Sequence, residues 1–283
     1  MTGPSRQLLG CDFSSSPSRR KPIVLALGSS AAGRVVLERL ERIESLPAFG
    51  AWLARPASWT GGFDFPFGLP RELLTRLGWP LTWRESIHHY AAMSRADIRD
   101  TFAAFCDARP VGSKFAHRAT DLPAGSSPSM KWVNPPVAFM LHAGVPALLA
   151  AGVHLPGLHA VDPNDVDGTG LPRRVALEAY PGLLARELIG HRSYKSDDKA
   201  KQTPERLIAR KDIITTLENG QTRLKLRLKL TNAQRDALAG DASGDSLDAA
   251  LCMVQAAWGE QQGAPRYGLP PDMDSLEGWI VTA

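Results

Sequence analysis

Residues 7–12 read QLLGCD, and residues 23–27 read IVLAL. Both runs are apolar and have the length of buried strands, and the polar stretch SSSPSRR at residues 14–20 lies between them. We therefore predict two strands joined by a hairpin connection. The next run, RVVLERLERI at residues 34–43, predicts a third strand, although its apolar spacing would also suit a helix.

Two more strands are expected further along the chain. Residues 46–54 predict a short helix, and WTGGFDF at residues 59–65 predicts a fourth strand. That strand should end at Pro66, because proline has no backbone N–H to donate to a strand ladder. RRVALE at residues 173–178 predicts a fifth strand.

The segment between these strands, residues 66–172, has a different character. Apolar residues recur there with helical spacing, which predicts helices at residues 71–77, 94–106 and 137–151. We interpret the whole segment as a mainly helical insertion that caps the core beside its functional cleft.

The C-terminal third continues with helices. Residues 181–189 and 204–217 each carry proline in the first turn of a predicted helix. TRLKLRLKL at residues 222–230 alternates leucine with basic side chains and favours an amphipathic strand, although helical pairing of the leucines is also possible. Residues 244–258 predict a helix with acids in its first turn, and residues 276–281 predict a last short strand.

Alternating strands and helices are typical of the α/β class. We expect a mixed five-stranded sheet flanked by helices. A chain of 283 residues can bury one large core, so we predict a single domain over residues 1–283 that contains the insertion.

Composition excludes several classes of protein. The chain is 43% apolar and 22% charged, which excludes a disordered or fibrous chain. No apolar run approaches the roughly 20 residues of a membrane span, and the N-terminus lacks the apolar centre of a signal peptide. We therefore expect a soluble, cytoplasmic protein with no membrane partner, and its three scattered cysteines should be reduced thiols. The net charge of +4 permits contact with phosphates.

Four aspartates share a place in the predicted fold. Asp12 ends the first strand, Asp64 ends the fourth, and Asp245 and Asp248 lie one turn apart on the late helix. Ligands of open α/β sheets bind at strand ends, so these carboxylates could form one acidic cluster. Such a cluster repels itself unless a cation neutralises it, and oxygen ligands suit Mg²⁺ or Mn²⁺. We predict Asp12, Asp64 and Asp248 as metal ligands.

Each of these carboxylates also has a structural interpretation. Asp12 and Asp64 could accept backbone hydrogen bonds in the turns that follow them. Asp245 could be an N-cap, and Asp248 could be a first-turn acid that the helix dipole favours. The combined pattern favours the functional interpretation.

Five short segments carry a resemblance to a known family: GCDFSSSP, FDFPFGLP, ALEAYPGLL, GDSLDAALCMVQAAW and EGWI. They are similar to motifs of the domain-of-unknown-function family four-two-nine, whose members are predicted nucleases with an RNase H-like fold. The resemblance covers about residues 8–280. GDSLDAALCMVQAAW also resembles the last helix of Holliday-junction resolvases, where acids bind metal.

The resemblance implies an RNase H-like core and a set of catalytic acids. Asp12 would match the first-strand aspartate, Asp64 the fourth-strand acid, and Asp248, with Asp245, the helix acids. Glu178 resembles the family's glutamate after the fifth strand, although a strand-end turn residue is an equal alternative. The acid that RNase H carries on its first helix has no recognisable counterpart in this chain.

Basic side chains near the acids could hold phosphates and position the scissile bond. The candidate substrate-binding residues are Lys114, Arg118, Lys131, Arg186 and Lys195. For any one of them, a solvated surface cation is the simpler interpretation.

Three functions remain open from the sequence. The first is a nuclease that hydrolyses phosphodiesters at a two-metal carboxylate site, with DNA or RNA as its partner. The second is an ATP-handling phosphotransferase with the same core, although Asp12-Phe13-Ser14-Ser15 lacks the glycine of its phosphate-binding turn. The third is a non-catalytic binding module. The sequence leaves the oligomeric state open.

Overall fold

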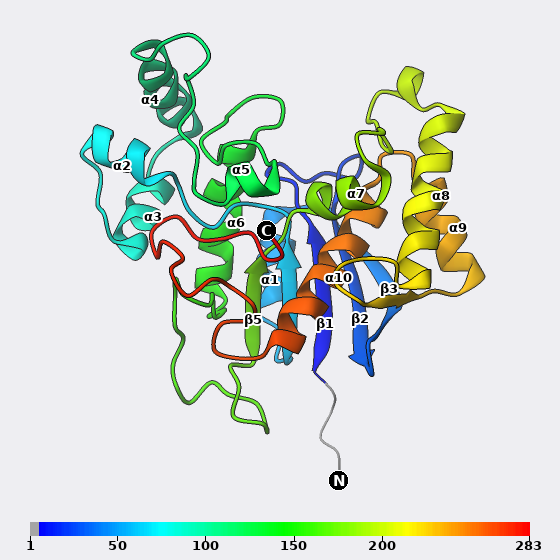
Figure 1. Ribbon diagram of the computed structural model, residues 1–283. Coiled ribbons are helices and arrows are strands. Elements are labelled where there is room, and N and C mark those ends of the chain that lie inside the picture. Colours follow the sequence, from blue (N-terminus) through cyan, green and yellow to red (C-terminus); the bar gives the residue numbers. More distant parts are fainter. Residues whose placement is uncertain (1–5) are drawn as a thin grey trace.

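The computed structural model describes residues 6–283. Residues 1–5, which the single-domain prediction and the signal-peptide argument include, lie outside the described residues. The described chain is α/β, with a mixed sheet in the order β5-β4-β1-β2-β3-β6 (Figure 1). The six strands are β1 (Gln7–Asp12), β2 (Ile23–Ala31), β3 (Arg34–Ile43), β4 (Trp59–Phe63), β5 (Arg174–Glu178) and β6 (Arg227–Lys229).

Helices lie on both faces of this sheet (Figure 1). They are α1 (Leu46–Leu53), α2 (Arg71–Leu77), α3 (Trp83–Ala91), α4 (Arg95–Asp107), α5 (Asp121–Ala124), α6 (Val137–Ala150), α7 (Pro181–Ile189), α8 (Pro204–Asn219), α9 (Asn232–Gly240) and α10 (Asp245–Gln262), with the short 3-10 helix η1 (Lys199–Lys201). None of the helices in residues 6–283 is both long enough and apolar enough to cross a membrane.

Alternation along β1 divides the core into two layers. Leu8 packs with α7 to α10 on one face, whereas Leu9 and Cys11 pack with α1 and α6 on the other. Successive side chains of a strand point to opposite faces, so a strand buried on both sides reads as a continuous apolar run. The same rule explains why QLLGCD lacks polar alternation.

Two glycines allow α10 to lie directly on the sheet. A Cβ on Gly10 of β1 would stand 1.9 Å from the carbonyl oxygen of Ala249, and a Cβ on Gly62 of β4 would stand 2.3 Å from that of Cys252. Any larger side chain would therefore push the helix away. This close approach brings the first turn of α10 to the ends of β1 and β4.

The segment of residues 66–172 contains α2 to α6, and within the part of the chain that the structure describes its only strand-like pairings are isolated bridges. Long turns and loops make up the remainder. In Figure 1 α2 to α5 lie above and beside the β5 edge of the sheet, on the side opposite α8 and α9.

The sequence placed β1 to β5 correctly, but the number of strands, two further strands and several helices differ from expectation. The sheet has six strands rather than five, because residues 227–229 pair in parallel with β3. Only those three residues of the predicted strand at 222–230 are extended in the ladder. The expected last strand is a single bridge between Ile280 and Glu178. The helices α3, α5 and α9 were not predicted.

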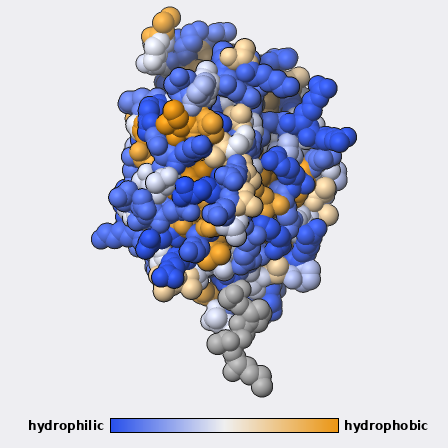
Figure 2. Space-filling model, turned by 90° about the vertical axis from the view of Figure 1, so that its right-hand side faces the viewer, coloured by the Kyte–Doolittle hydropathy of each residue, from blue (hydrophilic) through white to orange (hydrophobic). Residues whose placement is uncertain are grey.

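Figure 2 shows the side of the molecule that carries α8 and α9. This face is mainly hydrophilic, and its hydrophobic atoms form small groups among polar ones. The three cysteines are free and buried, so they contribute to the core rather than to this surface.

Candidate active site at the ends of β1 and β4

Asp12 and Asp64 lie side by side at the C-terminal ends of two neighbouring inner strands of the sheet. β1 and β4 are parallel neighbours, with Cys11 opposite Phe63. The backbone N–H of Asp64 donates to the carbonyl of Cys11 at 2.9 Å. Because Asp12 and Asp64 follow these two paired residues, their side chains leave the sheet on the same face, where α10 lies.

The first turn of α10 adds two more acids to this group. Asp248 is completely buried, and its carboxylate accepts a hydrogen bond from the Tyr194 hydroxyl at 2.6 Å. It also forms an ion pair with the Lys195 ammonium group. Asp245 forms a 2.9 Å ion pair with Lys21, which lies in the connection between β1 and β2. The four aspartates predicted from the sequence therefore converge, but two of them already have cationic partners.

The carboxylates of Asp12 and Asp64 have no such partner. Asp12 is 9% exposed, and no hydrogen bond or salt bridge within residues 6–283 reaches its side chain or that of Asp64. Burial and the neighbouring Asp248 carboxylate raise the pKa of Asp12 well above its ordinary value. Burial also raises the pKa of Asp64, to about 7, with further contributions from Asp248 and Glu178 that the charge of Lys195 partly offsets. Two unpaired acids beside a third therefore favour either protonation or a bound cation.

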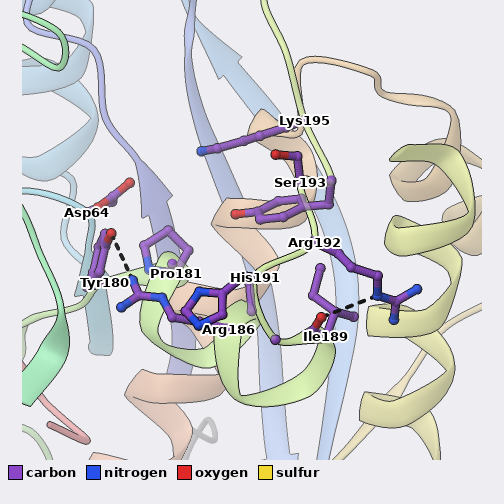
Figure 3. A pocket seen from close by; sticks show the side chains of 13 residues that line it. Asp64, Tyr180, Pro181, Arg186, Ile189, His191, Arg192, Ser193 and Lys195 are labelled. Atoms are coloured by element: carbon purple, nitrogen blue, oxygen red, sulfur yellow. Dashed lines mark hydrogen bonds between the residues drawn. The ribbon is translucent and has the colours of Figure 1, made fainter. Parts of the chain in front are cut away.

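Lys195 is held at this site by its backbone. Arg206 and Arg210 of α8 donate to the carbonyls of Lys195 and Tyr194, the latter at 2.7 Å. Figure 3 shows the Lys195 side chain extending from this segment toward Asp64. The lysine thus supplies a positive charge where the acids meet.

Glu178 does not join the acid group. It pairs with Phe63 across the ladder and therefore points to the face opposite Asp64. There it accepts a hydrogen bond from the Phe67 backbone at 2.9 Å and a bidentate pair from Arg118 at 2.6 and 2.8 Å. Because its oxygens are used in this way, Glu178 ties β5 to the insertion rather than serving as a free ligand.

Arg118 has the same structural role. It is 2% exposed, and its guanidinium also pairs with the buried Asp121 at 2.9 Å. An arginine whose donors are satisfied inside the protein is not free to bind a phosphate. The prediction of Arg118 as a substrate ligand therefore has no support in this geometry.

The other predicted basic residues differ in their surroundings. Lys114 is exposed and lies 3.5 Å from Asp107 after α4, and Lys131 is half-buried in the turn before α6. Neither lines a pocket with the acids. Arg186 of α7 lines a pocket together with Asp64, and it donates to the carbonyl of Gly125 at 3.1 Å.

Two pockets meet at the acid group, and both are lined by Asp64, Tyr180 and Lys195. The first, here called the basic pocket, has a volume of about 340 Å³ and is shown in Figure 3. Its further lining includes Arg186, His191 and Arg192. The second, here called the apolar pocket, has a volume of about 360 Å³ and lies between the sheet and the insertion.

Sequence reasoning missed the pairing role of Lys21. The basic run SRRK at residues 18–21 lies in the connection that directly follows Asp12, and this position was a usable signal. Lys195, which the sequence predicted as a substrate-binding residue, is paired with Asp248 in the structure.

No group of three or more His, Cys, Asp or Glu side chains in residues 6–283 is arranged to hold a metal ion. The ammonium groups of Lys21 and Lys195 explain this, because each takes one carboxylate of the cluster. No protein-family model, no curated protein and no solved structure significantly matches the chain.

Proposed function

We propose that the chain is a divalent-metal-dependent nuclease with an RNase H-like core. The observation that carries this proposal is the pair of carboxylates of Asp12, which is buried, and Asp64, which is half-buried; neither has a partner within residues 6–283, and both lie near Asp248. Like charges in a buried site are costly unless a cation neutralises them. The sheet of β1 to β5, with helices on both faces, supports the RNase H-like core that the sequence resemblance implies.

The donor set is suited to Mg²⁺ or Mn²⁺, because both ions prefer carboxylate oxygens. Asp12 and Asp64 would hold the ion, and Asp248 would join them once Lys195 leaves its carboxylate. Bound ions would stabilise charge on the attacking and leaving oxygens of a phosphodiester. No other acid of the group is free, since Asp245 is paired with Lys21.

The basic pocket adjoins these acids and could hold the phosphates of a substrate. Arg192 lines this pocket, but it points away from Asp64 (Figure 3) and pairs with Asp212 at 2.7 Å. Arg186 and Lys195 line the pocket with positive charge next to Asp64. Fixed cations beside a carboxylate site can orient a phosphate backbone without taking part in bond breaking. We therefore assign these residues to substrate positioning and DNA or RNA as the partner.

Two substitutions with opposite expected effects test the metal site. Asp12→Asn removes a ligand charge and should lower Mn²⁺ affinity at least about 10-fold and abolish cleavage. Lys195→Met removes the competing ammonium group and should raise Mn²⁺ affinity about 10-fold. Titration calorimetry with Mn²⁺ alone measures both constants without requiring activity.

Cleavage is then measured with labelled single-stranded, duplex and hybrid substrates in Mn²⁺. Equal cleavage by the wild type and Asp12→Asn would contradict the assignment. An absence of both Mn²⁺ binding and cleavage in the wild type would instead favour a non-catalytic binding module.

A further inference from the structure

The apolar pocket differs in chemistry from the basic pocket that adjoins it. Its walls are mainly apolar and come from three parts of the chain: the turn after β4, the start of α6 and the C-terminal segment. These lining residues are Phe65, Pro66, Pro135, Val137, Met140 and Ile280. Such a surface favours a flat, largely apolar ligand group over a hydrated ion.

The charged residues of the apolar pocket do not change this conclusion. Arg118 and Glu178 line it, but they neutralise each other through two hydrogen bonds. Lys195 stands where the two pockets meet, so the interior itself has no free cation among the described residues. A phosphate would therefore be held in the basic pocket and not in the apolar one.

Groups suited to the polar edge of a ligand are also present. Ser126 and Ser127 contribute hydroxyls to the wall of the apolar pocket. The Ser126 hydroxyl donates to Asp121 at 3.0 Å, whereas no partner within residues 6–283 takes up the hydroxyl of Ser127. The Tyr180 ring stands between the pockets, with the guanidinium of Arg186 5.9 Å from its centre. An aromatic ring at such a position can stack on a second flat ring.

We propose that the apolar pocket receives an unpaired nucleobase whose adjoining phosphate lies in the basic pocket, over the acids. This inference rests on the proposed function and names its substrate class: single-stranded nucleic acid, or a nucleotide extruded from a duplex. A base that is stacked and paired in a duplex cannot enter a concave pocket until it leaves the stack. The shared wall of Asp64, Tyr180 and Lys195 gives the required continuity between base and phosphate.

The test measures binding in the absence of divalent metal, so its result does not depend on catalysis. Val137→Trp should fill the apolar pocket, and Val133→Trp is the matched control, since Val133 is 49% exposed and lies outside the pocket lining. The probes are a fluorescent single-stranded hexanucleotide, the same strand with abasic sugars, and a blunt duplex. Fluorescence anisotropy gives each dissociation constant.

For the hexanucleotide we expect Val137→Trp to weaken binding about 10-fold, the typical effect of losing one base-stacking contact, and Val133→Trp to leave it unchanged. The wild type should bind the abasic strand about 10-fold more weakly than the intact one, and Val137→Trp should remove that difference. Duplex affinity should be the same in all three proteins. Ser127→Trp, in a loop, serves as the second pocket-filling variant if Val137→Trp does not fold.

Equal affinity of the wild type for intact and abasic strands, or no effect of either pocket-filling variant, would overturn the inference. In that case loss of cleavage in Asp12→Asn would still uphold the proposed nuclease. Conversely, base-dependent binding without cleavage or Mn²⁺ binding would retain the nucleobase pocket and reject the nuclease.

Discussion

Asp64 is half-buried and has no hydrogen-bond or ion-pair partner within residues 6–283, so its protonation should be visible in the stability of the protein. Burial raises its pKa from 3.8 to about 7, so the native state binds this proton more tightly than the unfolded chain does. The resulting stabilisation is complete below pH 3.8 and is lost as pH rises to about 7. A pKa change of this size corresponds to about 4 kcal/mol, and because the side chain is half-buried, screening by solvent should reduce the loss in free energy of unfolding to on the order of 2 kcal/mol across that window in metal-free protein.

Urea unfolding in a chelator at several pH values measures this change. Asn at this position has no carboxyl group to titrate, so the free energy of unfolding of Asp64→Asn should fall less over the same pH range. The exposed Glu44 offers a matched control, and Glu44→Gln should follow the wild-type curve. Parallel curves for Asp64→Asn and the wild type would show that Asp64 is not the source of the effect.

At the scale of an element, the position of α10 depends on Gly10. An added Cβ would come within 1.9 Å of the Ala249 carbonyl and 2.3 Å of the Met253 nitrogen, both backbone atoms of α10. We expect Gly10→Ala to destabilise the protein by about 1–3 kcal/mol through overpacking. It should also lower Mn²⁺ affinity, because Asp248 moves with the helix.

Gly50 in α1 provides the same substitution without the contact, since nothing lies within 4 Å of the position that an added methyl group would take. Gly50→Ala should therefore be neutral or stabilise the protein by up to about 1 kcal/mol, as expected for glycine to alanine inside a helix. Denaturant unfolding distinguishes the two variants. Equal changes in the free energy of unfolding for Gly10→Ala and Gly50→Ala would show that close packing at Gly10 does not position α10.

Across the whole molecule, the Arg118–Glu178 pair joins the insertion to the sheet. Both side chains are buried, so removing the cation leaves Glu178 and Asp121 without compensation. We expect Arg118→Met to cost about 3–5 kcal/mol of stability. The exposed Arg99–Asp100 pair is the control, and Arg99→Met should cost less than about 1 kcal/mol.

Thermal and denaturant unfolding measure these costs, and nucleic-acid binding below the melting temperature is recorded alongside them. Wild-type stability with weakened binding in Arg118→Met would restore the sequence-based prediction that Arg118 contacts substrate. Lower stability with unchanged binding would establish its role in joining the two parts of the fold.

Local patterns in the sequence were sufficient for the α/β class and for the positions of β1 to β5. Apolar runs bounded by turn residues determine where a strand forms, since burial on both faces requires them. They also placed Asp12 and Asp64 at strand ends, and the parallel pairing of β1 with β4 brings those ends together. The length of β6 was overestimated, because only three residues of the alternating stretch at 222–230 pair with a neighbouring strand.

Local patterns in the sequence did not determine which cation pairs with which acid, although the position of SRRK after Asp12 placed Lys21 near the group. Lys195 pairs with Asp248 across 53 positions, and Lys21 pairs with Asp245 across 224. Glu178 and Arg118 are joined across 60 positions, on the opposite face of the sheet. Such pairs depend on which distant segments share a surface, because electrostatic attraction acts over a few ångströms in space and is insensitive to separation along the chain.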